Sequence, residues 1–153
     1  MVEGNALLPT APSHYLIGKM AEERGDLKMA LENFAIAADS NSEIGRQSSA
    51  DYVRLDLPLH PSQHLQTTTQ TDNYGNLYAV VTNPTAVAIG RVQLKVVQLD
   101  ANTGRVVGKS QPLFILGIDS GKRAEVIVPD VRLHSTQELQ LYKVLVESVV
   151  LGR

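Results

Sequence analysis

The spacing of the apolar residues changes near two prolines, Pro58 and Pro61, and this change constrains the fold more than any other feature. Before the prolines, apolar residues recur every three to four positions, as in a helix that buries one side. After them, apolar and polar residues alternate, as in a strand that buries one face. We therefore predict an α+β chain, with a helical segment at residues 1–57 and a β domain at residues 58–153.

The helical segment is predicted to contain two helices in an antiparallel hairpin, and a third helix at residues 42–55 that caps its open side. Thr10 or Ser13 can cap the first helix through a hydroxyl oxygen. Gly25 can end that helix in a left-handed conformation, and Asp26 can then cap the second. The apolar stripe of the first helix consists of Leu16, Ile17, Met20 and Ala21, and that of the second of Leu27, Ala30, Leu31, Phe34 and Ala38.

The β domain is predicted to be an antiparallel sandwich, because its short alternating runs are separated by Gly, Asn, Asp and Pro rather than by helical patterns. The polar run at residues 64–71 is assigned to the boundary with the helical segment. After Val96 the alternation slips, which indicates a β-bulge or a strand buried on both faces. A turn at residues 100–104 leads into a return strand. The expected strands cover residues 77–82, 92–99, 106–116, 124–128 and 139–151.

Small and large residues occupy set positions along the predicted hairpin. The small ones are Gly18, Ala21, Gly25 and Ala30, and the large aromatic ones are Tyr15 and Phe34. With these residues, positions 11–44 resemble one tetratricopeptide repeat, a helical hairpin with a period of about 34 residues. The resemblance implies that Gly18, Ala21 and Ala30 let the two helices approach closely, and that Phe34 and Ala37 pack against the next helix.

A single repeat cannot bury its own apolar face, and about three are normally needed for stability. The hairpin must therefore lean on the third helix, on the β domain, on another copy of the chain, or on repeats outside this sequence. In this family the first helix lines a groove that binds peptides, which implies a partner-binding face formed by Tyr15, Lys19, Glu22 and Glu23. The alternative is a solvated helix face in a hairpin that only acts as a scaffold.

The β domain is similar to the small immunoglobulin-like domains of bacterial envelope proteins, in particular the FxLYD type. The residues that carry this similarity lie at positions 94–100, 103–108, 118–122 and 124–126. A tetratricopeptide hairpin beside such a domain resembles the accessory regions of exported bacterial proteins, including some zinc metalloproteases. The resemblance implies an arrangement of domains and brings no catalytic residue with it.

No catalytic, cofactor-binding or metal-binding residue is predicted. The sequence contains no cysteine and no His-Glu-x-x-His pair. His60 and His64 have a ligand-like spacing, but they flank Pro61 with no acidic residue nearby, so we interpret them as loop histidines. Ser120-Gly121 is interpreted as a turn between strands rather than as a nucleophile elbow.

Nucleic acid is not predicted as a partner. The formal net charge is -2, and the basic residues Arg91, Lys95, Arg105 and Lys109 are interpreted as the wet face of a sandwich. No apolar run is long enough to cross a membrane. The expected location is the periplasm or cell envelope if the chain is cut from an exported protein, and the cytoplasm otherwise.

Together these features predict a non-enzymatic module for protein–protein interaction or assembly, an accessory fragment of a longer bacterial envelope protein that binds another protein or peptide. The alternative is a region that positions substrate for a hydrolase, such as a zinc metalloprotease, whose catalytic domain lies outside this sequence. Because the strands are rich in valine, pairing of strand edges into a homodimer stays open.

Overall fold

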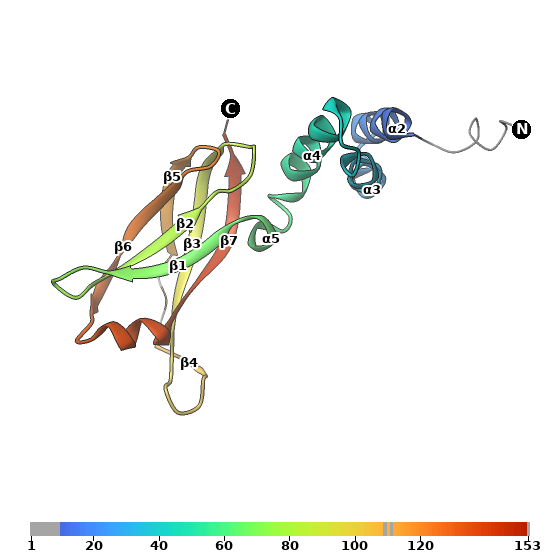
Figure 1. The fold of residues 1–153 in the computed structure, drawn as a ribbon. Coiled ribbons are helices and arrows are strands. Elements are labelled where there is room, and N and C mark those ends of the chain that lie inside the picture. Colours follow the sequence, from blue (N-terminus) through green and yellow to red (C-terminus); the bar gives the residue numbers. More distant parts are fainter. Residues whose placement is uncertain (1–9, 109, 111, 153) are drawn as a thin grey trace, which may run out of the picture. The chain divides into compact units, whose positions relative to one another are not determined.

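The computed structural model describes residues 10–108, 110 and 112–152, and it has the predicted α+β layout (Figure 1). Helices come first along the chain, and antiparallel strands follow. The chain divides into two compact units between Leu59 and His60. We describe each unit by itself.

The helical unit contains three helices, α2 (Ala11–Glu23), α3 (Leu27–Ala38) and α4 (Glu43–Asp56). Each helix begins at a side-chain cap that accepts a hydrogen bond from a backbone N–H of the first turn. The caps are Thr10, Asp26 and Ser42. Gly25, with φ of 78°, separates the first two helices as predicted. Helix α4 packs against α3 and α2, which confirms the predicted third helix.

The core of the helical unit is built on Phe34, which is completely buried together with Ala21 and Ala30. The buried Gly18 lies beside the Phe34 ring, so the smallest residues of α2 face α3. The apolar stripe predicted for α2 is therefore wrong in part. Of its four members only Ala21 is buried, whereas Leu16, Ile17 and Met20 are 60%, 39% and 50% exposed. Close packing of the two helices selects the side of α2 that bears small residues rather than its most apolar side.

The second unit is an antiparallel sandwich of two sheets, preceded by the short helix α5 (Pro61–His64). One sheet has the order β1-β2-β6, and in the other β3 pairs with β4 and β5 on one side and with β7 on the other. The two sheets lie one behind the other in Figure 1. The strands are β1 (Gln66–Thr71), β2 (Asn76–Thr82), β3 (Ile89–Leu99), β4 (Val106–Val107), β5 (Pro112–Ile118), β6 (Arg123–Arg132) and β7 (Tyr142–Leu151).

The alternation predicted along β3 is confirmed, because Val92, Leu94 and Val96 are buried while Arg91 is exposed. The slip after Val96 corresponds to Val96 and Val97 both being buried. The register shifts of β3 against β7 occur earlier, next to Ile89 and Gln93. The strand is therefore buried on both faces at Val96 and Val97, as one of the two predicted alternatives required, and Gln98 beyond them is exposed.

Three predicted elements differ from the structure. The polar run assigned to the domain boundary forms strand β1, which pairs with β2 along its whole length. The predicted return strand at residues 106–116 is wrong, because β4 ends at Val107, before Gly108 with its φ of 75°, and β5 begins at Pro112. Leu139 and Leu141, assigned to the last strand, lie in a 3-10 helix, η1 (Thr136–Leu141), and the strand begins only at Tyr142.

Two polar side chains hold the loops of the sandwich. The fully buried amide of Asn83 donates to the carbonyl oxygens of Val87 at 2.8 Å and Ile118 at 3.1 Å. Its oxygen accepts from the Thr85 hydroxyl at 2.6 Å. The carboxylate of Asp72 accepts hydrogen bonds from the residues of the β1–β2 turn, including the side chain of Asn76 at 2.9 Å. Both loops are thus ordered by one side chain each.

Candidate functional site

The predicted partner-binding face lies on α2, and the structure uses most of it inside the helical unit. Tyr15 packs against the buried Phe34, with ring centroids 5.8 Å apart and planes tilted by 48°. Burial, followed by a hydrogen bond to Asp51, raises the pKa of the Tyr15 hydroxyl. Tyr15 is therefore a packing residue that joins α2 to α3 and α4, and it is half-buried.

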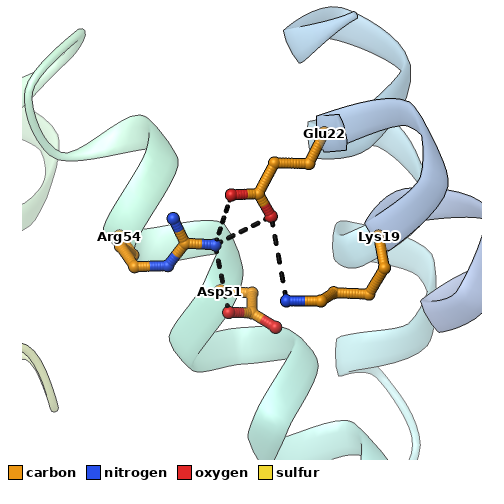
Figure 2. Close-up of polar contacts among 4 residues, drawn as sticks. All are labelled: Lys19, Glu22, Asp51 and Arg54. Atoms are coloured by element: carbon orange, nitrogen blue, oxygen red, sulfur yellow. Dashed lines mark hydrogen bonds and ion pairs between the residues drawn. The ribbon is translucent and has the colours of Figure 1, made fainter. Parts of the chain in front are cut away.

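Glu22 and Lys19 belong to a cluster of charges between α2 and α4, which Figure 2 shows. The Arg54 guanidinium on α4 donates to both carboxylate oxygens of Glu22 at 2.8 Å and to Asp51 at 3.3 Å. The Lys19 ammonium lies 4.0 Å from Glu22. Burial on its own lowers the pKa of Arg54, but the hydrogen bond and charge of Glu22 outweigh it and raise that pKa. This cluster positions α4 against α2.

Glu23 is exposed, and it is the one residue of the predicted set for which the structure shows no side-chain hydrogen bond or ion pair within the described part of the chain. The structure thus brings Tyr15, Lys19 and Glu22 together on the side of α2 that faces α4. Glu23 lies farther around the helix. Partner binding by these four residues stays a prediction.

A second surface on the same hairpin is apolar and open. Leu16, Ile17 and Met20 of α2 are neighbours at helical spacings of three and four residues, on the side turned away from α4. On α3, Met29 and Ile36 are 38% and 52% exposed and seven residues apart, so they share one side of that helix. We name these five residues the outer face of the hairpin.

The two halves of the outer face adjoin one another across the seam between α2 and α3. The His14 Nδ1 atom lies 2.9 Å from the Asn33 Oδ1 atom at this seam. Ile17 follows His14 by one helical turn, Met29 precedes Asn33 by one turn, and Ile36 follows it by one. A guanidinium nitrogen of Arg24 also reaches the sulfur of Met29 at 3.4 Å. The outer face is therefore continuous from one helix to the other.

Single exposed apolar residues are common, whereas large contiguous apolar patches are a feature of interaction sites. Five long aliphatic side chains share the outer face, and the exposed Glu32 lies between Met29 and Ile36 on the same side of α3. The signal for this face was present in the sequence. Because Gly18, Ala21 and Ala30 are the residues small enough for close helix packing, the large apolar residues of α2 had to lie elsewhere.

The outward side of the sheet that contains β3 is a weaker candidate for a functional site. Arg91 and Lys95 lie on one side of β3, and Arg91 stands over the Phe114 ring of β5 at 5.7 Å from its centroid. Leu116, which is 78% exposed, pairs with Arg91. Arg105 lies beyond β3 in the loop before β4, and Lys109 is outside the described residues. The predicted basic stripe is thus a pair of cations flanked by apolar side chains.

A cavity of about 330 Å³ opens in the sandwich, with walls made mainly of valines from β3, β4 and β6. Tyr142 and Asp130 also line it. Burial, followed by the charge of Glu138, raises the pKa of the Tyr142 hydroxyl. Asp130 has φ of 62°, at the point where β6 loses its register against β2. The cavity could hold a small apolar group.

In the described part of the chain, the other residues that could bind a metal ion or act as a nucleophile are not grouped into a site. Among residues 10–108, 110 and 112–152, no three His, Cys, Asp or Glu side chains are grouped to hold a metal ion. Ser120 lies in the predicted turn, and its hydroxyl donates to the carbonyl oxygen of Thr85 at 2.6 Å. Within the same described part, no helix has the length and apolar character needed to cross a membrane.

No family model matches this sequence, and no curated protein matches it. Among solved structures, the chain is similar to a DUF1425 family member from Shewanella sp. pv-4, with a TM-score of 0.34 and 17% identity. That similarity covers 56% of this chain and 77% of the other. The chain is also similar to the alkylpurine DNA glycosylase AlkC of Pseudomonas fluorescens, bound to DNA that contains an abasic site analog.

For AlkC the TM-score is 0.26 and the identity 13%. The similarity covers 86% of this chain and 52% of that chain, so this chain spans about half of the glycosylase. Likenesses at these TM-scores carry no conclusion about function. The candidate site therefore rests on the geometry of the hairpin alone.

Proposed function

We propose that the chain is a non-enzymatic module for protein–protein interaction or assembly, and that its outer face docks another polypeptide. The observation that carries this proposal is the exposure of Leu16, Ile17 and Met20 on one side of a well-packed helix. Covering a half-exposed aliphatic side chain contributes about 1 kcal/mol. The whole outer face could therefore contribute roughly 5 kcal/mol to docking, before the cost of association is subtracted.

The more specific assignment, to a bacterial envelope protein, follows from the two family resemblances of the sequence. A tetratricopeptide-like hairpin beside an FxLYD-like sandwich belongs to an accessory region of a bacterial envelope protein, and we propose the periplasm or envelope as its location. The hairpin geometry supports the first resemblance, because Gly18, Ala21 and Ala30 make the close contact that the repeat requires. Under the alternative reading, the same face positions a substrate protein for a hydrolase domain outside this sequence.

The experiment compares affinity purification of three versions of the full chain from cells that produce it. The first is unchanged, and the second carries Leu16→Glu with Met20→Glu in the outer face. The matched control carries Ala35→Glu with Gln47→Glu, two exposed positions away from that face. The proposal predicts a protein that is recovered with the unchanged chain and the control, and lost with the outer-face variant.

Recovery of the same proteins with all three versions would contradict the proposal, as would turnover of a defined substrate by the purified chain. Identification of the recovered protein separates the two readings. A structural protein supports assembly, whereas a hydrolase domain supports substrate positioning.

A further inference from the structure

We infer that the outward side of the sheet that contains β3 docks an acidic amphipathic helix of another polypeptide. This surface is separate from the outer face of the hairpin, and the inference does not depend on that face. Two observations carry it. The surface holds two cations that have no acidic partner, and exposed apolar side chains lie on both sides of them.

The register of three strands arranges this surface in columns. Val92 and Leu94 of β3 are buried inside the sandwich, so the residues that alternate with them point outward. We name the outward residues of β5, β3 and β7 the β3 face; in register they are Leu116, Arg91 and Val150, then Phe114, Gln93 and Ser148, then Pro112, Lys95 and Leu145. A polar, cationic column on β3 is thus flanked by two mainly apolar columns.

The cations of the β3 face are unpaired. In the described part of the chain, no carboxylate oxygen lies within 4.0 Å of the charged nitrogens of Arg91 or Lys95. Glu147 is the single acidic residue of β3, β5 and β7, and it lies where the register of β7 shifts. Arg91 stands over the Phe114 ring instead, and Lys95 is half-buried. Covering these cations is unfavourable unless the covering molecule brings negative charge, so a partner of this face must be acidic.

The flanking columns call for a partner that is also apolar. Phe114, Leu145 and Val150 are each about half exposed, and Leu116 is exposed over most of its surface. A sheet buries an apolar face against another layer of structure. The inner side of this sheet already packs inside the sandwich, so its apolar outward side indicates a further layer.

The dimensions of the β3 face fit a helix. Neighbouring strands lie about 4.8 Å apart, so the two apolar columns are separated by about 10 Å, which is the diameter of a helix with its side chains. Arg91 and Lys95 are four residues apart on one strand, or about 13 Å. Carboxylates seven or eight residues apart on a helix are separated by about 11–12 Å along its axis and match that spacing. An extended strand laid on this face would leave its own backbone groups unpaired.

An anionic membrane fits the same face less well. Basic segments that bind acidic lipids contain clusters of about four to eight lysines and arginines. The β3 face has two cations, and the formal net charge of the chain is -2. The same two cations suffice for two carboxylates of a polypeptide.

Binding of a designed peptide tests the inference. The probe is a fluorescein-labelled helix of about 18 residues, long enough to be helical in water, built from leucine, glutamate and alanine with glutamates beside the leucine stripe. The matched peptide has glutamine in place of every glutamate. Fluorescence anisotropy is measured while the full chain is added up to about 1 mM. We expect a dissociation constant on the order of 10–100 μM for the acidic peptide, because the interface is small, and clearly weaker binding of the glutamine peptide.

Variants of the full chain locate the site. Arg91→Gln with Lys95→Gln should weaken binding of the acidic peptide about tenfold, since both charge contacts are lost. The matched control, Lys28→Gln with Arg123→Gln, removes the same charge from exposed positions on α3 and on the other sheet, and it should leave binding unchanged. Leu116→Ser with Leu145→Ser should also weaken binding. Circular dichroism establishes that each variant is folded.

Three results would overturn the inference. The first is the absence of saturable binding, or equal binding of the acidic and glutamine peptides. The second is equal weakening by the β3-face variant and its charge-matched control. The third is binding that is lost with Leu16→Gln and Met20→Gln, which would place the peptide on the outer face of the hairpin. Binding to phosphatidylglycerol vesicles in place of the peptide would also overturn it. None of these results decides whether the outer face docks a protein, which affinity purification tests separately.

Discussion

Gly18 of α2 lies so close to Phe34 of α3 that a Cβ atom at position 18 would come within 2.7 Å of the Phe34 ring. This contact sets the distance between the two helices. It also decides which side of α2 is buried and which side becomes the outer face.

Gly18→Ala should therefore destabilise the helical unit. Alanine gains about 1 kcal/mol of helix propensity over glycine. The clash costs about 1–3 kcal/mol, because the ring is fully buried and cannot turn away freely. We expect a net loss of about 1 kcal/mol in thermal or urea denaturation followed at 222 nm. The double variant Gly18→Ala with Phe34→Leu should lose less than the sum of its parts, and an additive result would contradict the contact.

The ion pair between Glu22 and Arg54 should stabilise the packing of α4 on α2. The pair is partly exposed, with side chains 24% and 38% accessible, so we expect a coupling of about 0.5–1 kcal/mol. A double-mutant cycle with Glu22→Gln and Arg54→Gln measures it, and 1 M salt should reduce it. The exposed pair of Glu43 and Arg46 is the matched control and should couple more weakly. Equal coupling energies for the two pairs would show that the ion pair of Glu22 and Arg54 does not stabilise the packing of α4 on α2.

Asn83 should be required for the stability of the sandwich. Replacement by alanine leaves the buried carbonyl oxygens of Val87 and Ile118 without their donor, which costs about 2–3 kcal/mol. We expect a lower midpoint for the β transition in urea. Asn102→Ala, in an exposed turn, should change that midpoint by less than a quarter as much. A similar effect of the two variants would contradict the role assigned to Asn83.

Asp72 should give the sandwich an acid-sensitive loop. Hydrogen bonds, first from the Asn76 side chain and then from backbone N–H groups and Tyr78, lower the pKa of Asp72 to about 2. A lowered pKa contributes stability that is fully present above about pH 4 and is lost as the pH falls through 2. The difference in melting temperature between the unchanged chain and Asp72→Asn should therefore shrink between pH 5 and pH 2. A difference independent of pH would contradict this account.

The sequence predicted the ends of the helices better than their buried sides. Thr10, Gly25 and Asp26 act through local backbone geometry, which can be inferred from neighbouring residues. The buried side of α2 depends on how closely α3 approaches, and periodicity does not contain that information. Leu16 and Met20 were expected to pack inward for this reason, and they lie in the outer face.

In the sandwich, strands with strong alternation such as β3 were predictable. Strand β1 was missed because its threonines and glutamines have no apolar alternation, and its pairing with β2 is a tertiary property. The 3-10 helix at Leu139 was missed because Leu139 and Leu141 are two residues apart, which is also the spacing of apolar residues in a strand. For the predicted partner-binding face, the sequence was enough to infer the position and the solvent exposure of Glu23 only. The contacts of Glu22 with Arg54 join residues far apart in the sequence.

The most direct test of the central claim is the accessibility of the outer face inside cells that produce the chain. With no native cysteine, Met20→Cys and Gln47→Cys each present a single thiol, one in the outer face and one at an exposed position of α4. The ratio of their maleimide labelling rates is compared between intact cells and the dilute purified chain. We predict that Met20→Cys is labelled at least tenfold more slowly than Gln47→Cys in cells, and at a similar rate after dilution. Equal rates in both settings would show that nothing covers this face, and would contradict the claim.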